Sequence, residues 1–147
     1  MHLLDVNVVV ALCDTAHEFH EDAGAWFGGV RSGGWATCPI TENGLVRIFG
    51  HPAYPDGPGS PAKARIFLQA LTRTPGHAFW ADDVSIADSV VFPSLHNANS
   101  SSLTDLYLLG LAIHRGARFA TFDRHIDTSI FPGDLAALAF VPVSARK

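Results

Sequence analysis

The sequence predicts an α/β protein, a three-layer α/β/α sandwich built on a mostly parallel central sheet. Short apolar runs alternate with stretches in which apolar residues recur at helical spacing. Alternating strands and helices imply right-handed crossovers, which leave helices on both faces of the sheet. The chain has 147 residues, 48% of them hydrophobic, so we expect residues 1–147 to form a single domain with its own core.

The strands are expected where short runs are apolar, β-branched or aromatic. They are residues 2–6, 35–38, 78–81, 117–122 and 137–143. Capping patterns at Asn7, Thr15, Thr41 and Ser60 predict helix starts between the strands. The expected helices are residues 8–13, 15–33, 41–50, 61–73 and 104–115, with a short segment at 85–92. Residues 51–60, rich in Pro and Gly, are expected to form a loop and a candidate lid.

Acidic residues stand at the ends of several of these elements. Asp5 and Asp123 end two of the strands, and Glu42 lies in the first turn of a helix. Asp105 opens the apolar helix of residues 104–115 and shares its apolar stripe, so its carboxylate is expected to point inward. Ligands of parallel sheets bind beyond the carboxyl ends of the strands. The four acids therefore meet at one edge, provided that the loop of residues 93–102 returns Asp105 to it.

Four carboxylates this close together require a compensating charge. Like charges at short range raise one another's pKa, and a hard divalent cation relieves the conflict. Mg²⁺ favours oxygen ligands, keeps several waters and takes one or two carboxylates directly. We expect Asp5 and Asp105 to be direct ligands, with Glu42 and Asp123 either completing the shell of the same ion or forming a second metal position. Such a site hydrolyses phosphodiester bonds through a metal-activated water.

Several segments carry a resemblance to a known family. They are LLDVNVVVAL, PITENGLVRIFGHP and LTDLYLLGLAIHRGARFATFDRHI, followed by a closing strand. Together they resemble the PIN-domain ribonucleases, specifically the VapC toxins of bacterial toxin–antitoxin pairs. The resemblance implies Asp5, Glu42, Asp105 and Asp123 as the acidic site, with Mg²⁺ or Mn²⁺ as the metal. It also implies an RNA substrate, products with 5′-phosphate and 3′-hydroxyl ends, a homodimer and a cognate antitoxin that blocks the site.

The same resemblance suggests supporting roles for other residues. Asn7 and Thr121 match positions that often hold polar neighbours of the acids. Some members place a further acid just after the last aspartate, whereas here Asp127 lies four residues beyond Asp123 and receives no role. Arg47 lies off the apolar stripe of its helix, and the sequence leaves open whether it contacts phosphate or is merely solvated.

Composition limits the other classes of function. The formal charge of −4 argues against a protein that coats nucleic acid non-specifically. It does not argue against a nuclease, because an acidic site loaded with metal presents positive charge. The chain has no apolar run long enough to cross a bilayer and no signal-peptide pattern, so a cytoplasmic protein without membrane contact is expected. Cys13 and Cys38 lie within apolar segments and are expected to be buried.

Each of the four acids also has a purely structural interpretation. Ser102 and Asp105 form a capping pattern, Asp5 suits a turn or cap, and Glu42 complements a helix dipole. Asp123 is followed by Arg124 and suits a surface pair. One metal site explains all four positions at once, whereas the structural readings are four separate accounts.

Other candidate sites are weaker. His17 and His20 share a helix face without a third zinc ligand and are expected on the solvated side. Asp82, Asp83 and Asp88 are interpreted as turn and surface acids.

Three classes of protein are alternatives to a ribonuclease. A phosphatase of the haloacid dehalogenase type needs a second aspartate two residues after the first, where this chain has Asn7. A phosphoryl-receiver domain that binds Mg²⁺ needs paired acids near Asp5 and a late lysine, and the sequence has neither. A non-catalytic PIN scaffold with an acidic pocket stays open, because residue identity does not exclude it.

Overall fold

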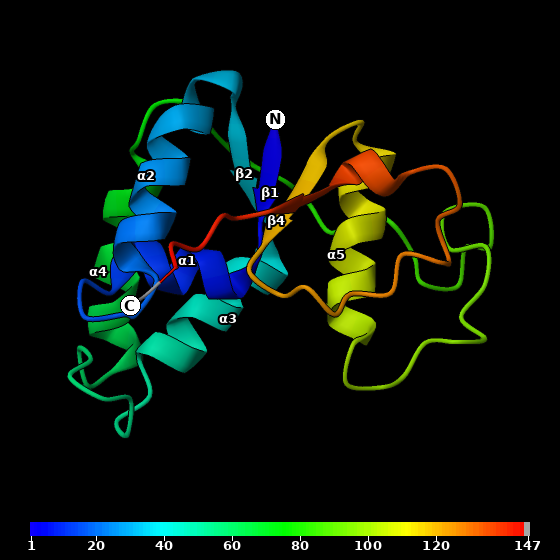
Figure 1. The fold of residues 1–147 in the computed structure, drawn as a ribbon. Helices are drawn as coiled ribbons and strands as arrows, with labels where there is room; N and C mark the ends of the chain where they lie inside the picture. The colour runs from blue at the N-terminus through cyan, green and yellow to red at the C-terminus, as the bar shows by residue number, and fades with distance from the viewer. Residues whose placement is uncertain (146–147) are drawn as a thin grey trace.

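Strands and helices alternate along the chain in the computed structural model, which describes residues 1–145 (Figure 1). The strands are β1 (His2–Leu4), β2 (Trp35–Thr37), β3 (His77–Phe79), β4 (Arg118–Thr121) and β5 (Leu138–Phe140). The helices are α1 (Val6–Cys13), α2 (His20–Val30), α3 (Pro39–Phe49), α4 (Pro61–Thr72) and α5 (Leu103–His114). Two 3-10 turns lie at Arg31–Gly33 and Leu135–Ala137.

The five strands form one sheet in the order β3-β2-β1-β4-β5, and each neighbouring pair is parallel. β1 is the central strand, with His2 opposite Trp35 of β2 and Arg118 of β4. The parallel sheet predicted from the sequence is therefore confirmed. Its carboxyl ends lie together at one edge, where the chain enters α1, α3 and the segments that follow β3 and β4.

Alternate residues of each strand serve the two faces of the sheet. Leu3, Phe119 and Leu138 belong to the buried cluster that packs against α5. Their neighbours Leu4, Ala120 and Ala139 belong to the cluster formed with α1, α3 and α4. Because both faces are covered, the residues at the centre of each strand are apolar, as is usual in parallel sheets. Figure 1 shows the two helical layers on either side of the sheet. Cys13 and Cys38 are buried and unbridged, as expected.

Two helix starts differ from the prediction. Asp5, not Asn7, is the N-cap of α1, and its Oδ1 accepts the Val6 N–H at 2.6 Å. The third helix begins at Pro39, two residues before the predicted cap, because Thr41 works from inside the helix. Its Oγ1 accepts the Cys38 N–H at 3.0 Å. At both helix starts, the residue predicted as the N-cap is a polar residue inside the first turn of the helix, and the true N-cap precedes it.

Two further boundaries were also wrong. The helix expected from Thr15 begins at His20, because residues 15–19 form turns instead of the predicted capping box. The helical segment expected at 85–92 is a run of turns, in which Asp88 Oδ1 accepts the Val90 N–H at 2.8 Å. Asp and Ser side chains that bond to backbone two residues on favour turns over helix. Within residues 1–145, no helix has the length and apolar character needed to span a bilayer.

Candidate active site

A cavity of about 350 Å³ lies at the carboxyl edge of the central strands, and three aspartates line it. Asp5 follows β1, Asp123 follows β4, and Asp105 lies in the first turn of α5. The loop that precedes α5 therefore returns the chain to this edge, as the sequence argument required. The other lining residues are Val6, Asn7, Val10, His17, Ile48 and Tyr54.

Asp5 is fixed from both sides. Its backbone N–H donates to Ala120 O at 2.9 Å and so extends the β1–β4 ladder by one residue. Its Oδ1 caps α1, while its Oδ2 accepts the Thr121 hydroxyl at 2.6 Å. With only 5% of the residue exposed, the carboxylate has little freedom to rotate. Capping and lining the cavity are thus compatible roles of the same side chain.

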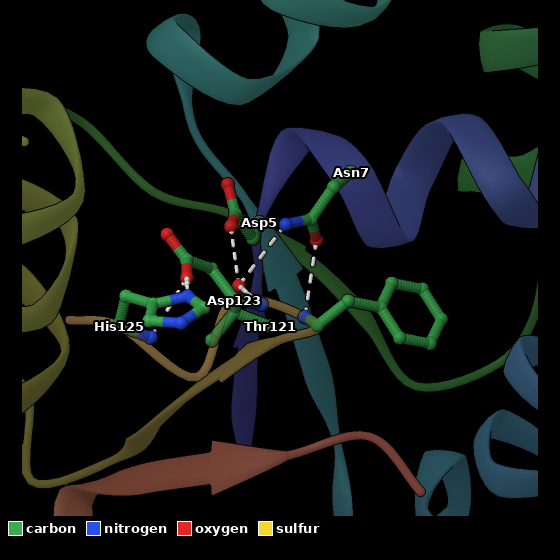
Figure 2. Close-up of polar contacts among 6 residues, drawn as sticks. Asp5, Asn7, Thr121, Asp123 and His125 are labelled. Carbon is green, nitrogen blue, oxygen red and sulfur yellow. Dashed lines mark hydrogen bonds and ion pairs between the residues drawn. The ribbon is translucent and has the colours of Figure 1, made fainter. Parts of the chain in front are cut away.

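Thr121, the last residue of β4, connects the polar groups of the site (Figure 2). Its Oγ1 donates to Asp5 and accepts two hydrogen bonds, from Asn7 Nδ2 at 3.1 Å and from the Asp123 N–H at 3.0 Å. A hydroxyl has one donor and two acceptor positions, so its capacity is filled. The direction of the Thr121 O–H bond is therefore set toward Asp5.

Asn7 closes the network on its other side. Its Oδ1 accepts the Phe122 N–H at 3.4 Å while its Nδ2 donates to Thr121. This orients the amide and ties the first turn of α1 to the end of β4. Asp123 Oδ1 accepts the His125 N–H at 2.8 Å and lies 3.3 Å from His125 Nδ1. The His125 side chain is 96% exposed, so this contact adds little to stability.

Asp105 is not used as a helix cap. Within residues 1–145 the Ser102 side chain makes no capping hydrogen bond, and the Ser102 N–H donates to Asn99 Oδ1 at 3.0 Å. Asp105 instead faces the cavity, where burial and then the charge of Asp123 raise its pKa above the ordinary value.

The electrostatics of the cavity reflect the convergence of these acids. The pKa of Asp5 is raised from 3.8 to about 6, chiefly because the carboxyl is buried. The charges of Asp105 and Asp123 contribute to this rise, while hydrogen bonds from Thr121 and Val6 oppose it. A buried carboxylate among like charges is unfavourable unless a proton or a cation accompanies it. The site is therefore suited to bind positive charge.

Glu42 does not join the three aspartates. Its Oε1 accepts the Thr37 hydroxyl at 2.6 Å, and the same hydroxyl lies 2.8 Å from His77 Nε2. Both partners are residues of the sheet, so the side chain is directed at β2 and β3 and does not line the cavity. Among residues 1–145, no group of three His, Cys, Asp or Glu side chains is arranged to enclose a metal ion.

Mg²⁺ does not require such an enclosure, because it keeps several waters and takes one or two carboxylates directly. The donors around the cavity are carboxylate, amide and hydroxyl oxygens, which are the ligands that hard cations prefer. The chemistry of the donor set and the raised pKa of Asp5 therefore fit Mg²⁺ or Mn²⁺.

Two lining residues were missed from the sequence. His17, assigned to the solvated side, is half-buried against the cavity, and its Nδ1 accepts the Phe19 N–H at 3.1 Å. Tyr54 comes from the loop of residues 51–60, where its hydroxyl donates to Asp14 Oδ2 at 2.7 Å. A single aromatic residue in a Pro- and Gly-rich loop was the available signal for Tyr54. Its bond to Asp14 and its packing on Phe49 hold part of the candidate lid against the body of the protein.

Two residues with open assignments lie outside the cavity. Arg47 is exposed on α3 and lines neighbouring grooves. Asp127 is exposed, and its Oδ1 accepts the Ser129 N–H at 2.8 Å, a local turn contact that lowers the pKa of this carboxyl.

Comparison with known proteins identifies the family. The model of the PIN domain matches residues 2–129. Ribonuclease VapC44 of Mycobacterium tuberculosis is 46% identical over 131 residues, which cover 89% of this chain and 92% of the relative. The chain belongs to the VapC family of PIN-domain proteins. Ribonuclease VapC38 of the same species is 43% identical over 128 residues, which cover 87% of this chain and 89% of the relative.

The VapC fold is also seen among solved structures. VapBC2 from Rickettsia felis, bound to a DNA fragment from its promoter, matches with a TM-score of 0.59 and 12% identity. The match covers 95% of this chain and 96% of the other. At this identity the likeness concerns the fold alone, and it confirms the PIN-like architecture expected from the sequence. Membership of the VapC family sets aside the phosphatase and receiver alternatives.

Proposed function

We propose that this chain is a Mg²⁺-dependent endoribonuclease that hydrolyses RNA phosphodiester bonds as the toxin of a toxin–antitoxin pair. The observation that carries the proposal is the convergence of Asp5, Asp105 and Asp123 on one cavity, with Asp5 buried at a pKa of about 6. The relatives named ribonuclease cover almost the whole chain, which supports the same reaction here.

Each residue of the site has a role in this proposal. Asp5, Asp105 and Asp123 hold the ion, and Mn²⁺ can replace Mg²⁺. When bound, the ion supplies an activated water and stabilises negative charge on the phosphate. Thr121 and Asn7 position the carboxylate of Asp5 and the backbone of Asp123. Glu42 reaches the ion only if its side chain leaves Thr37, so we assign it an outer position without a direct bond.

Partners follow from the family and the charge of the site. A cognate antitoxin blocks the acidic cavity, and the active toxin is a homodimer that works in the cytoplasm, where its RNA substrates are. Light scattering of the purified chain tests the dimer. Co-purification with the product of the adjacent reading frame tests the antitoxin.

The test of the reaction is cleavage of a fluorescent RNA by the purified protein in Mg²⁺. We expect Asp5→Asn and Asp105→Asn to lose cleavage by about a hundredfold or more, and EDTA to abolish it. Glu21→Gln, which removes an exposed acid of α2, is the matched control and is expected to cleave normally. Circular dichroism shows whether each variant is folded.

Cleavage by folded Asp5→Asn at the wild-type rate contradicts the assignment of the site. Absence of cleavage by the wild-type protein, with Mg²⁺ binding retained, identifies a non-catalytic PIN scaffold instead.

A further inference from the structure

A second groove, of about 530 Å³, adjoins the aspartate cavity. Val6 lines both, and Thr104 of the groove directly precedes Asp105 of the cavity. The remaining lining residues are Pro39, Ile40, Asn43, Gly44, Arg47 and Asp82. One wall is therefore apolar, while the rest offers a cation, an amide, a hydroxyl and a carboxylate. We call this space the α3 groove.

Charge distinguishes the α3 groove from another groove that adjoins the aspartate cavity. This other groove shares His17 and Tyr54 with the cavity and is lined by Asp14, Glu18 and Asp56, and no Lys or Arg is among its described lining residues. Arg47, by contrast, lines the α3 groove and a further groove beside it. A phosphodiester chain leaving the aspartates meets acids in the groove of Asp14, Glu18 and Asp56, whereas the α3 groove offers it the cation of Arg47.

Asp82 is the acid of the α3 groove, although the sequence interpretation treated it as a turn acid. It follows β3 and so stands at the same carboxyl edge as Asp5. The segment around it is held at several points. The Trp80 N–H donates to Thr37 O at 2.8 Å, and the buried Trp80 ring lies 5.4 Å from the Arg115 guanidinium. A segment held this firmly is suited to present a specificity group.

The residues after Asp82 are anchored to α5 and the turn that follows it. Arg115 forms an ion pair with Asp83 at 2.9 Å. The Tyr107 hydroxyl donates to Val84 O at 2.9 Å, and Val84 itself is buried. Asp82 is thus fixed from both flanks.

The carboxylate of Asp82 is under-satisfied. Its Oδ1 is buried and has no well-aligned hydrogen-bond donor among the described residues. The Cys38 thiol, a weak donor, interacts with the Asp82 carboxylate, and burial first and then the hydrogen bond and charge of Asp82 raise the thiol pKa to about 11. A carboxylate with one oxygen cut off from water and good donors gains most from a ligand that donates to the oxygen on its groove side.

We propose that the α3 groove is a specificity subsite that selects guanine in the nucleotide beside the scissile phosphate. Arg47 contacts a phosphate, the wall of Val6, Pro39 and Ile40 packs against the plane of the base, and Asp82 accepts hydrogen bonds from its Watson–Crick edge. Guanine presents two adjacent donors there, N1–H and the N2 amine, and both can donate to the groove-side oxygen of Asp82. Single-stranded RNA is commonly recognised through such edges.

This inference rests on the proposed ribonuclease function, so its test has one arm that needs cleavage and one that does not. In the first arm, a pool of RNA with random sequence is cleaved and the product ends are sequenced. We expect guanine at one fixed position beside the cut for the wild-type protein. Asp82→Asn is expected to lose that preference by about tenfold or more, since a neutral amide oxygen is a weaker acceptor than a carboxylate oxygen and the amide amine is a donor itself.

Two variants serve as comparisons in this arm. Arg47→Ala is expected to slow cleavage of all sequences similarly, because a phosphate contact carries no sequence information. Asp88→Asn, an exposed acid of the same stretch whose Oδ1 contact an amide oxygen can replace, is expected to keep the wild-type preference.

In the second arm, Asp5→Asn protein in EDTA binds a short fluorescent RNA that contains one guanine, and inosine or 7-deazaguanine replaces this base. Inosine lacks the N2 amine, so we expect weaker binding by about fivefold or more, whereas 7-deazaguanine, which keeps both donors, binds normally. This arm needs no Asp82 variant and so remains valid if Asp82→Asn misfolds.

The two proposals fail in different ways. Equal binding of guanine and inosine RNA, or an unchanged preference in folded Asp82→Asn, overturns the subsite. Absence of cleavage with retained guanine-selective binding overturns the ribonuclease function and leaves the subsite intact.

Discussion

The buried carboxylate of Asp5 predicts how the stability of the metal-free protein depends on pH. Its pKa is about 6 in the folded chain against an ordinary value of 3.8. The folded state therefore binds its proton more tightly than the unfolded state does, and the free energy of unfolding falls as pH rises between about 4 and 6. The difference in pKa corresponds to about 3 kcal/mol in total. About 2 kcal/mol of this separates pH 8 from pH 4.5, where the unfolded carboxylate is still mostly ionised.

Urea unfolding in EDTA, followed by tryptophan fluorescence, measures this dependence. The chain has three tryptophans, and Trp35 is fully buried, so unfolding changes its environment. Other groups also titrate over this range, so the comparison is with Asp5→Asn, which has the same shape and no charge. We expect the wild-type protein to gain about 2 kcal/mol more than the variant between pH 8 and pH 4.5. If the free energy of unfolding changes with pH by the same amount in the two proteins, the claim that burial raises the pKa of Asp5 is refuted.

The remaining predictions concern the metal and the packing around it. Mg²⁺ at about a hundred times its dissociation constant is expected to stabilise the wild-type protein at pH 7.5 by about 2.7 kcal/mol, and Asp105→Asn much less, in thermal melts. Thr121→Val keeps the shape but removes the hydroxyl that serves Asp5. We expect Thr121→Val to lower the free energy of unfolding, measured in urea, by about 1 to 3 kcal/mol. We also expect Thr121→Val to slow cleavage more than Thr121→Ser, which keeps the hydroxyl. Gly44→Ala places a Cβ 2.6 Å from Val6 Cγ2 where α3 crosses α1, and is expected to cost about 1 to 3 kcal/mol. An unchanged free energy of unfolding in urea contradicts this prediction and shows that α1 shifts to accommodate the added Cβ.

The positions of the strands along the chain could be predicted because they depend on local signals, whereas their order in the sheet was not predicted. Short apolar runs such as that of Leu3 and Leu4 are continuous because both faces of a parallel sheet are covered. The helix at Ser60 and Pro61 was placed correctly because its cap and its first residue both act within one turn. Contacts between neighbours in sequence are the ones that a pattern can report.

The site was harder to predict, because its geometry depends on contacts between residues that are far apart in the sequence. The sequence places Asp105 at the site only if the loop before it returns to the carboxyl edge of the sheet. In the structure the loop does so. Glu42 has the same relation to its helix as Asp105 has, yet Thr37 of the adjacent strand takes its carboxylate. Asp82 looked like a turn acid, because nothing in its neighbourhood in sequence reveals the groove that α3 builds beside it. Side-chain direction at a sheet edge is set by residues far along the chain.

The hydroxyl of Thr121 joins two parts of the chain that are made at different times. Asp5 comes long before Thr121 and Asp123 in the chain, so it is synthesised well before they are. The central strand also lacks one of its two neighbours until β4 is complete. A partly translated or prematurely terminated product consequently has no assembled centre. For a protein whose activity harms the cell that makes it, this order of synthesis is a built-in safeguard.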